Sequence, residues 1–124
     1  MIPKYRAWDK ELQTMLDVSL IDFKKGVLVG EHWEFGETNF MNFDEIVLMQ
    51  STGLFDKKGV EIFEGDVLTS QNYPVKGVVE FRTDLGLWVH YLKGYSYFEY
   101  LGNVASSKEI IGNVYENREL LEDK

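Results

Sequence analysis

The stretch TGLFDKKGVEIFEGDVL, residues 52–68, places charged residues and glycines at regular intervals between apolar residues. Its DKKG segment (56–59) has the composition of a tight turn, because Asp bonds neighbouring backbone groups and Gly accepts a positive φ. The alternation in VEIF (60–63) predicts a short strand. EGD (64–66) predicts a second turn, and the next strand begins directly after it. The stretch therefore predicts turn, strand, turn and strand.

Outside this stretch, short apolar segments of period two alternate with Gly, Asn and Asp, and no segment keeps the helical period for three turns. Two hairpins are predicted near the N-terminus, in KYRAWDKELQTML (4–16) and SLIDFKKGVLVG (19–30). EHWEFGETNFMNFDE (31–45) mixes large aromatics with acids, and it fits either a packed loop or an irregular strand pair. EIVLMQ (45–50) predicts a buried strand.

The C-terminal part contains five further strand-like segments, with turn signals between them. These are Val60–Phe63, Val67–Thr69, Val78–Phe81, Trp88–Leu92 and Ile110–Tyr115. Short, strongly bent strands in this number predict an SH3-like barrel from Leu48 to about Tyr115. Residues 95–102 fit a further strand or a loop, and Asn117 predicts the N-cap of a short terminal helix. We therefore expect a mainly β protein, with an N-terminal hairpin region (1–47) and a barrel region with a short terminal helix (48–124).

Composition excludes several kinds of site. The chain has no cysteine, which excludes disulfides, thiolate metal sites and cysteine nucleophiles. The net charge is −8, and no Lys or Arg occurs between Lys25 and Lys57, so a nucleic-acid partner is not expected. No apolar run has the length of a signal peptide or a membrane span. These features predict a cytoplasmic protein without a membrane partner.

Three ordered motifs resemble one family. KYRAWDKELQTM (4–15), LMQSTGLFDKKGVEIFEGDVL (48–68) and IGNVYENRELL (111–121) are similar to the opening, central and closing motifs of the phage YopX family. The resemblance covers essentially the whole chain. It implies a bacteriophage or prophage protein of a Gram-positive host, with no established activity and with an SH3-type barrel in its C-terminal part. Ser51, Phe55 and Val60 depart from the family pattern, and the last two add apolar surface beside the 56–59 turn.

Candidate chemistry is sparse. His32 and His90 are far apart in the sequence and lack metal-ligand spacing, and lysines interrupt any calcium loop in residues 56–66. Glu61, Glu64 and Asp66 could form an acid pair for catalysis, but strand alternation predicts outward-facing or turn-stabilising roles. No nucleophile motif or phosphate-binding glycine loop is present. We therefore expect no cofactor, no metal site and no enzymatic activity.

The strongest indication of a binding site is a cluster of aromatic residues. The segment 88–100 contains Trp88, Tyr91, Tyr95, Tyr97, Phe98 and Tyr100. Such residues can fill a small barrel, or they can line a groove that binds a peptide or stacks bases. Candidate partner-binding residues are Phe55, Val60, Trp88, Tyr91, Tyr95, Tyr97 and Tyr100.

The sequence thus predicts a non-catalytic protein-interaction module, whose partner is a phage or host protein or a second copy of the chain. A nucleic-acid-associated barrel is the first alternative, and a concentrated basic patch would distinguish it. An enzyme that uses the acidic cluster is the second alternative.

Overall fold

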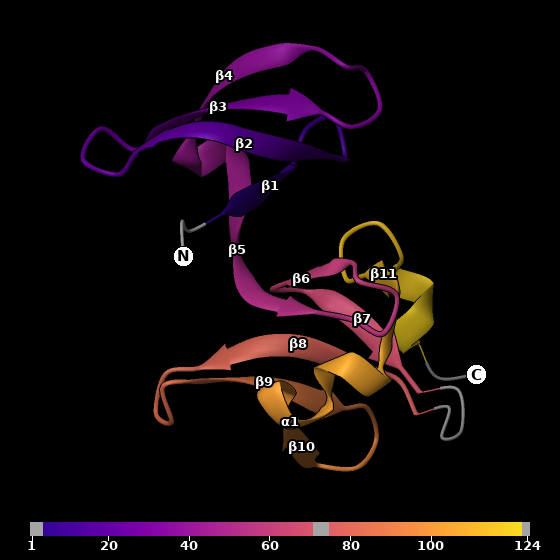
Figure 1. Cartoon of the computed structure of the whole chain (residues 1–124). Coiled ribbons are helices and arrows are strands. Elements are labelled where there is room, and N and C mark those ends of the chain that lie inside the picture. Colours follow the sequence, from indigo (N-terminus) through magenta and orange to yellow (C-terminus); the bar gives the residue numbers. More distant parts are fainter. Residues whose placement is uncertain (1–3, 71–74, 123–124) are drawn as a thin grey trace. The chain divides into compact units, whose positions relative to one another are not determined.

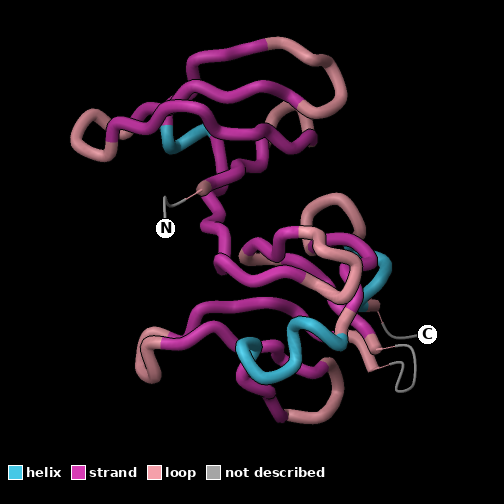
Figure 2. Tube along the Cα trace, viewed as in Figure 1, coloured by secondary structure: helices cyan, strands magenta, loops and turns pink. Residues whose placement is uncertain are grey.

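The computed structural model describes residues 4–70 and 75–122, and the fold is mainly β with antiparallel strand pairs. Strands account for most of the trace, and the helical segments are short (Figures 1 and 2). The chain forms two compact units, unit 1 (Met1–Gln50) and unit 2 (Ser51–Lys124).

Unit 1 is a meander followed by a crossover. Its elements are β1 (Tyr5–Asp9), β2 (Thr14–Asp22), β3 (Val27–His32), β4 (Thr38–Asn42), the 3₁₀ helix η1 (Phe43–Glu45) and the first half of β5 (Ile46–Phe55). The strand order is β4-β3-β2-β1-β5. The η1 helix therefore carries the chain from one edge of the sheet to the other. Residues 31–45, for which the sequence predicts either a packed loop or an irregular strand pair, form the end of β3, a turn, β4 and η1.

Aspartates at strand ends close the turns of unit 1. Oδ1 of Asp9 accepts the N–H groups of Glu11 and Leu12, each at 3.0 Å. Oδ1 of Asp22 accepts the N–H of Lys25 at 3.0 Å. A short side-chain acceptor satisfies turn backbone groups in this way. The two predicted N-terminal hairpins are confirmed.

The core of unit 1 lies on one face of its curled sheet. Cross-strand pairing aligns Ile21 with Leu28 and Leu28 with Met41. The buried cluster consists of Ala7, Leu16, Leu28, Met41 and Ile46. Removal of such side chains from water is the main force that stabilises a small unit of this kind.

The second half of β5 belongs to unit 2, where it pairs with β6 (Glu61–Phe63). The buried Thr52 hydroxyl joins the two strands, since it donates to the carbonyl of Ile62 at 2.8 Å. The same oxygen accepts the N–H of Leu54 at 3.0 Å.

The remainder of unit 2 is a five-stranded sheet. Its elements are β7 (Asp66–Thr69), β8 (Gly77–Arg82), β9 (Leu87–Leu92), β10 (Tyr97–Tyr100), the helices α1 (Leu101–Val104) and η2 (Ala105–Ser107), and β11 (Glu109–Asn113). The strand order is β10-β9-β8-β7-β11. The buried cluster consists of Ile62, Leu68, Val79, Leu101 and Ala105, so α1 and η2 contribute to the core. Residues 95–102, for which the sequence predicts either a strand or a loop, include the turn before β10, β10 itself and the start of α1.

The closing motif is a side-chain-bonded turn followed by a single 3₁₀ turn, η3 (Arg118–Leu121). Oδ1 of Asn113 accepts the N–H groups of Tyr115 and Glu116 at 3.0 and 2.9 Å. Asn117 occupies the N-cap position, but its side chain does not cap the helix. Its amide oxygen instead accepts the N–H of Asn113 at 3.1 Å.

The mainly β architecture with a short helix near the C-terminus is thus confirmed. The SH3-like barrel stays a prediction. Within residues 4–70 and 75–122, none of the helices has the length and apolar character needed to cross a bilayer.

Candidate functional site

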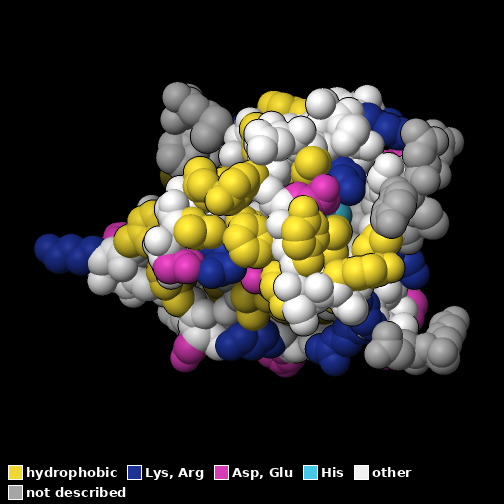
Figure 3. Space-filling model, turned by 90° about the horizontal axis from the view of Figure 1, so that it is seen from below, with side chains coloured by type: hydrophobic (Ala, Val, Ile, Leu, Met, Phe, Trp, Pro, Cys, Tyr) yellow, Lys and Arg dark blue, Asp and Glu magenta, His cyan; other side chains and the backbone are white. Residues whose placement is uncertain are grey.

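The tyrosine-rich segment lies along the edge strand β10 and its neighbour β9. Tyr91, Tyr97 and Tyr100 are 39%, 56% and 46% exposed, and Tyr95, in the turn before β10, is 60% exposed. Apolar side chains gather over the side of the molecule on which β10 and α1 lie, with a few charged groups between them (Figure 3). These four tyrosines therefore do not fill the core. Exposed apolar area of this kind is typical of an interaction surface.

Strand register divides the aromatics between two faces of the sheet. Tyr97 and Glu99 lie on the face that carries the core of unit 2. Phe98 and Tyr100 lie on the opposite face, together with Tyr91, which pairs with Phe98. The predicted aromatic set is thus two sets, one on each face of the sheet.

The opposite face is partly covered by unit 2 itself. The guanidinium carbon of Arg82 lies 5.0 Å from the centroid of the Phe98 ring, and the Phe98 and Tyr100 rings meet edge to face. Arg82 also donates to both carboxylate oxygens of Asp84, at 2.9 and 2.7 Å. These contacts leave less of this face open to a partner.

A cavity of about 320 Å³ opens beside Tyr97. It is lined by Ser70, Val75, Leu92, Tyr95, Tyr97, Glu99 and Lys108. Its apolar and aromatic walls with a few polar groups are the usual composition of a binding site, at the small end of the usual size range. A cavity of this size suits one or two side chains of a bound peptide.

An ion pair forms the polar wall of the cavity. Nζ of Lys108 lies 3.2 Å from Oε1 of Glu99, and Nδ1 of His90 lies 3.4 Å from the same oxygen. Lys108 is buried and the Glu99 side chain is 25% exposed. Because both contacts use Oε1, Oε2 of Glu99 remains an acceptor at the cavity wall. The three residues come from three separate segments of the chain.

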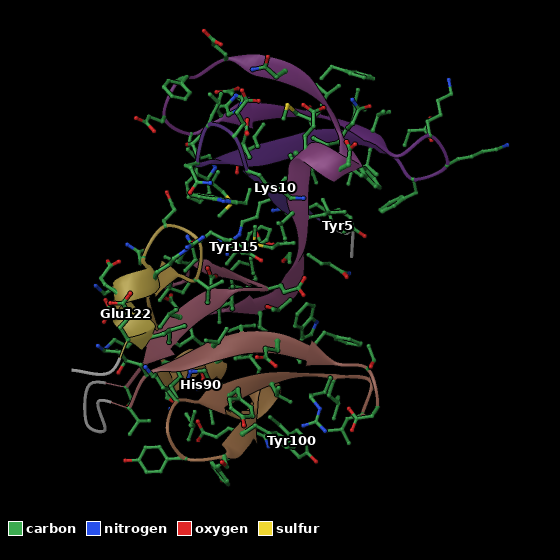
Figure 4. All side chains as sticks on the ribbon, turned by 180° about the vertical axis from the view of Figure 1, so that it is seen from behind. Tyr5, Lys10, His90, Tyr100, Tyr115 and Glu122 are labelled. Carbon is green, nitrogen blue, oxygen red and sulfur yellow. The ribbon has the colours of Figure 1, made fainter. Side chains whose placement is uncertain are left out.

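His90 is fully buried, and it supports this wall without lining the cavity. A Cβ on Gly77 would lie 2.5 Å from Nε2 of His90, so the ring requires glycine at that position. Burial lowers the pKa of His90 by more than Glu99 raises it, so the ring is neutral at pH 7. The Glu99 contact places the proton on Nδ1, and Nε2 has no hydrogen-bond partner among the described residues. Figure 4 labels His90 within unit 2 and Tyr100 at its margin.

Trp88, also in the predicted set, packs mainly against the core cluster of unit 2. Its ring meets Phe81 edge to face, with centroids 5.1 Å apart. Its indole is only partly accessible. Trp88 is therefore the member of the set most closely tied to the core.

Phe55 and Val60 flank the 56–59 turn and are 52% and 51% exposed. The Asp56 N–H donates to the Val60 carbonyl at 2.8 Å, and Gly59 has φ +80°. Neither Phe55 nor Val60 lines the cavity beside Tyr97. Ile110, at the start of β11, donates its N–H to Oδ2 of Asp56, so the turn is tied to the sheet.

Two members of the predicted acidic cluster, Glu61 and Asp66, accept hydrogen bonds that stabilise the fold. Oε2 of Glu61 accepts the hydroxyl of Ser51 at 2.5 Å. Oδ2 of the buried Asp66 accepts the N–H of Phe63 at 2.8 Å. Among the residues that the structure describes, no three His, Asp or Glu side chains are grouped in a way that could hold a metal ion. The absence of catalysis and of cofactors stays a prediction.

His32, the other histidine, is the last residue of β3. Its Nε2 lies 2.9 Å from Oδ2 of Asp9, and its Nδ1 lies 3.0 Å from the amide nitrogen of Asn39. His32 is only 2% exposed, and its ring meets Phe35 edge to face. The network connects β1, β3 and β4, which is a structural role.

Lys108 and Glu99 were not predicted as site residues. A single lysine before a strand carries no local signal. Glu99 carries a weak one, since it is the only charge in the aromatic strand YFEY. Their meeting depends on strand register and on the path through α1 and η2.

These features define a class, namely an antiparallel β protein of two small units with an aromatic-lined cavity in the second. The family model described as YopX protein matches residues 4–122, and the chain belongs to this family. The crystal structure of protein EF1440 from Enterococcus faecalis is 28% identical, with 98% of this chain and 99% of that chain covered and a TM-score of 0.70.

The crystal structure of YopX from Bacillus subtilis is 22% identical, covers 98% of this chain and 97% of its own, and has a TM-score of 0.57. At this identity the likeness concerns the fold. Comparison with curated proteins gave no match.

Proposed function

We propose that the protein is a non-catalytic interaction module of a phage or prophage, and that the cavity beside Tyr97 binds an extended segment of a partner protein. The observation that carries the proposal is the pair of half-exposed rings, Tyr95 and Tyr97, at a cavity whose polar wall is the Glu99–Lys108 ion pair. The phage role rests on the resemblance described above.

Three features of the site suit an extended peptide. Tyrosine rings offer large rigid contact area at little cost in conformational entropy. Glu99 and Lys108 offer an acceptor and donors that can orient peptide groups. β10 pairs with β9 on one side, so its other edge can add a strand whose alternate side chains enter the cavity. We therefore expect an apolar anchor side chain in a segment that binds in extended conformation.

The test is selection of peptides from a random displayed library on the immobilised full chain, followed by fluorescence polarisation with synthetic copies of the selected peptides. Tyr97→Ala should weaken binding about tenfold, as for an anchor residue at the centre of an interface. Tyr91→Ala is the matched control, because this exposed ring lies on the opposite face, and it should bind as the wild type does. Failure to select any peptide, or equal loss in both variants, would contradict the proposal.

Binding of nucleic acid is tested by the same fluorescence polarisation measurement. A second hollow, of about 290 Å³, has Lys76 and Lys93 beside Tyr95, with Glu122 also in its wall. A labelled single strand that binds at low salt and is released by added salt would favour this alternative over a peptide. We expect no binding, because the acid partly offsets the two lysines and the chain is acidic overall.

A further inference from the structure

The strand β4 is an open edge of the unit 1 sheet, since it pairs with β3 on one side. His32 donates its N–H to the carbonyl of Glu37, and Phe43 donates to Gly26, at 3.0 and 2.8 Å. In an antiparallel ladder the bonding direction alternates along the strand. The odd-numbered residues of β4 therefore bond β3, and the backbone groups of Thr38, Phe40 and Asn42 point away from the sheet.

An apolar row leads to this edge on the outer face of the sheet. Register places Leu20 opposite Val29 and Val29 opposite Phe40. Leu20 and Phe40 are both 67% exposed, the largest exposed fractions among the large apolar side chains of the described chain. The three residues contribute to a hollow of about 400 Å³. An exposed edge without Lys, Pro or a bulge is a template for pairing with another strand.

The sequence of β4 is suited to pairing with itself. TNFMN carries no charge, although acidic residues flank it on both sides. Antiparallel pairing about a two-fold axis at Phe40 places Phe40 opposite its own copy, and Thr38 opposite Asn42 of the second copy. In this register Glu37 faces Phe43 of the second copy, and Asp44 faces Gly36. No acid faces an acid, so an acidic chain can associate here without direct repulsion.

The backbone groups at this edge match that register. Phe40 can exchange two hydrogen bonds with its copy, and the N–H of Thr38 can donate to the carbonyl of Asn42 of the second copy. The N–H of Asn42 is already bonded to Oε1 of Glu45 at 2.9 Å, and this bond need not break. The two apolar rows would then join into one across the interface.

We infer that β4 is a self-association site, at which two copies of this chain pair antiparallel about Phe40. The contact is isologous, so it closes as a dimer. It uses unit 1 and does not depend on the proposed peptide site of unit 2.

The test is the mass of the full chain in solution, measured by light scattering after size exclusion over a series of concentrations. The wild type should reach twice the chain mass of 14.4 kDa. Phe40→Lys should raise the dissociation constant at least tenfold, since it puts two like charges directly opposite each other. Leu85→Lys, at a 40% exposed position in the β8–β9 turn, is the matched control and should remain dimeric.

A wild type that stays at the mass of one chain, a mass above two chains, or a Phe40→Lys variant that dimerises normally would each overturn the inference. Amide exchange of the wild type provides a second measurement, in case the variant fails to fold. The N–H groups of Thr38 and Phe40 should be protected in concentrated solution and exchange faster on dilution. Exchange that does not depend on concentration would also overturn it.

Discussion

Asp56→Asn tests whether one carboxylate ties the 56–59 turn to the sheet of unit 2. Oδ1 of Asp56 accepts the N–H groups of Lys58 and Val60, both at 2.9 Å, and Oδ2 accepts the N–H of Ile110 at 3.1 Å. Asparagine keeps one acceptor oxygen, so the two turn bonds can persist. Its NH₂ group cannot accept, and the Ile110 N–H loses its partner.

The expected decrease in the free energy of unfolding follows from these three hydrogen bonds. An N–H left without a partner costs about 1–3 kcal/mol, and the two turn bonds each weaken by roughly 1 kcal/mol when their acceptor becomes neutral. We expect Asp56→Asn to lower the free energy of unfolding by about 3–5 kcal/mol. For a chain of this size, that lowers the melting temperature by roughly 10–20 °C.

The assay is urea unfolding at pH 7, followed by circular dichroism and tryptophan fluorescence, with amide exchange of Ile110 as the local measurement. The Ile110 N–H should lose protection in the variant. Asp84→Asn is the control, because Asp84 is a largely exposed carboxylate that pairs with Arg82, and it should unfold as the wild type does. A loss below about 1 kcal/mol, or unchanged protection at Ile110, would refute the assigned role of Asp56.

The stabilisation of the fold by the Asp56 carboxylate should depend on pH. Burial alone would raise the pKa of Asp56, but the N–H groups of Ile110, Val60 and Lys58 outweigh it and lower the pKa. A carboxyl with a lowered folded pKa stabilises the fold above its unfolded pKa, and this contribution is lost as the pH falls through the folded value. The difference between wild type and Asp56→Asn should therefore be full at pH 7 and shrink below the ordinary pKa of 3.8.

Two further substitutions test packing and bonding in unit 2. Gly77→Ala should destabilise by about 1–3 kcal/mol, because the added Cβ would lie 2.5 Å from Nε2 of His90. Thermal unfolding measures it, with Gly102→Ala as the control, since a Cβ there meets no heavy atom within 4 Å. Thr52→Val should cost about 2 kcal/mol in urea unfolding, because it removes the buried hydroxyl that joins β5 to β6. Thr69→Val should cost less, since its hydroxyl contact is 3.5 Å long, and equal losses would contradict the role of Thr52.

The turns could be predicted because their chemistry is local. Asp9, Asp22 and Asp56 each bond backbone groups within a few residues of themselves. Such bonds depend on short stretches of sequence that can be recognised without knowing the fold. The hairpins on either side of these turns follow from them.

The edge strands were harder to predict for a physical reason. β4 and β10 expose aromatic side chains, with Phe40 and Tyr97 more than half exposed. A strand pattern is recognised when apolar residues alternate with polar ones, and exposed aromatics obscure that alternation. Solvent exposure of an aromatic depends on what packs against it, which the sequence does not state. The same limit applies to the wall of the cavity, where Glu99 and Lys108 meet through register and not through spacing.

The curvature of the unit 1 sheet follows from the length of one connection. In unit 1 the consecutive strands β4 and β5 lie at opposite ends of the order β4-β3-β2-β1-β5. Four strand spacings of about 4.8 Å would separate them by roughly 19 Å in a flat sheet. The steps from Asn42 through η1 to Ile46 span at most about 14 Å when extended, and less as a 3₁₀ helix. The sheet must therefore curl, so that the Asn42 end of β4 lies close to Ile46 at the start of β5.

Unit 2 repeats this strand order, with α1 and η2 as the connection between its edge strands β10 and β11. Helical residues advance only about 1.5–2 Å each, so this longer connection spans little more than the roughly 19 Å of four strand spacings. The side chain of Lys108, just before β11, reaches Glu99 of β10, with Nζ 3.2 Å from Oε1. No repeat is visible in the sequence, because the common order depends on hairpins and one short crossover, which many sequences can supply. The ion pair at the cavity therefore depends on this connection between β10 and β11, and its two residues can vary in position among chains with the same strand order.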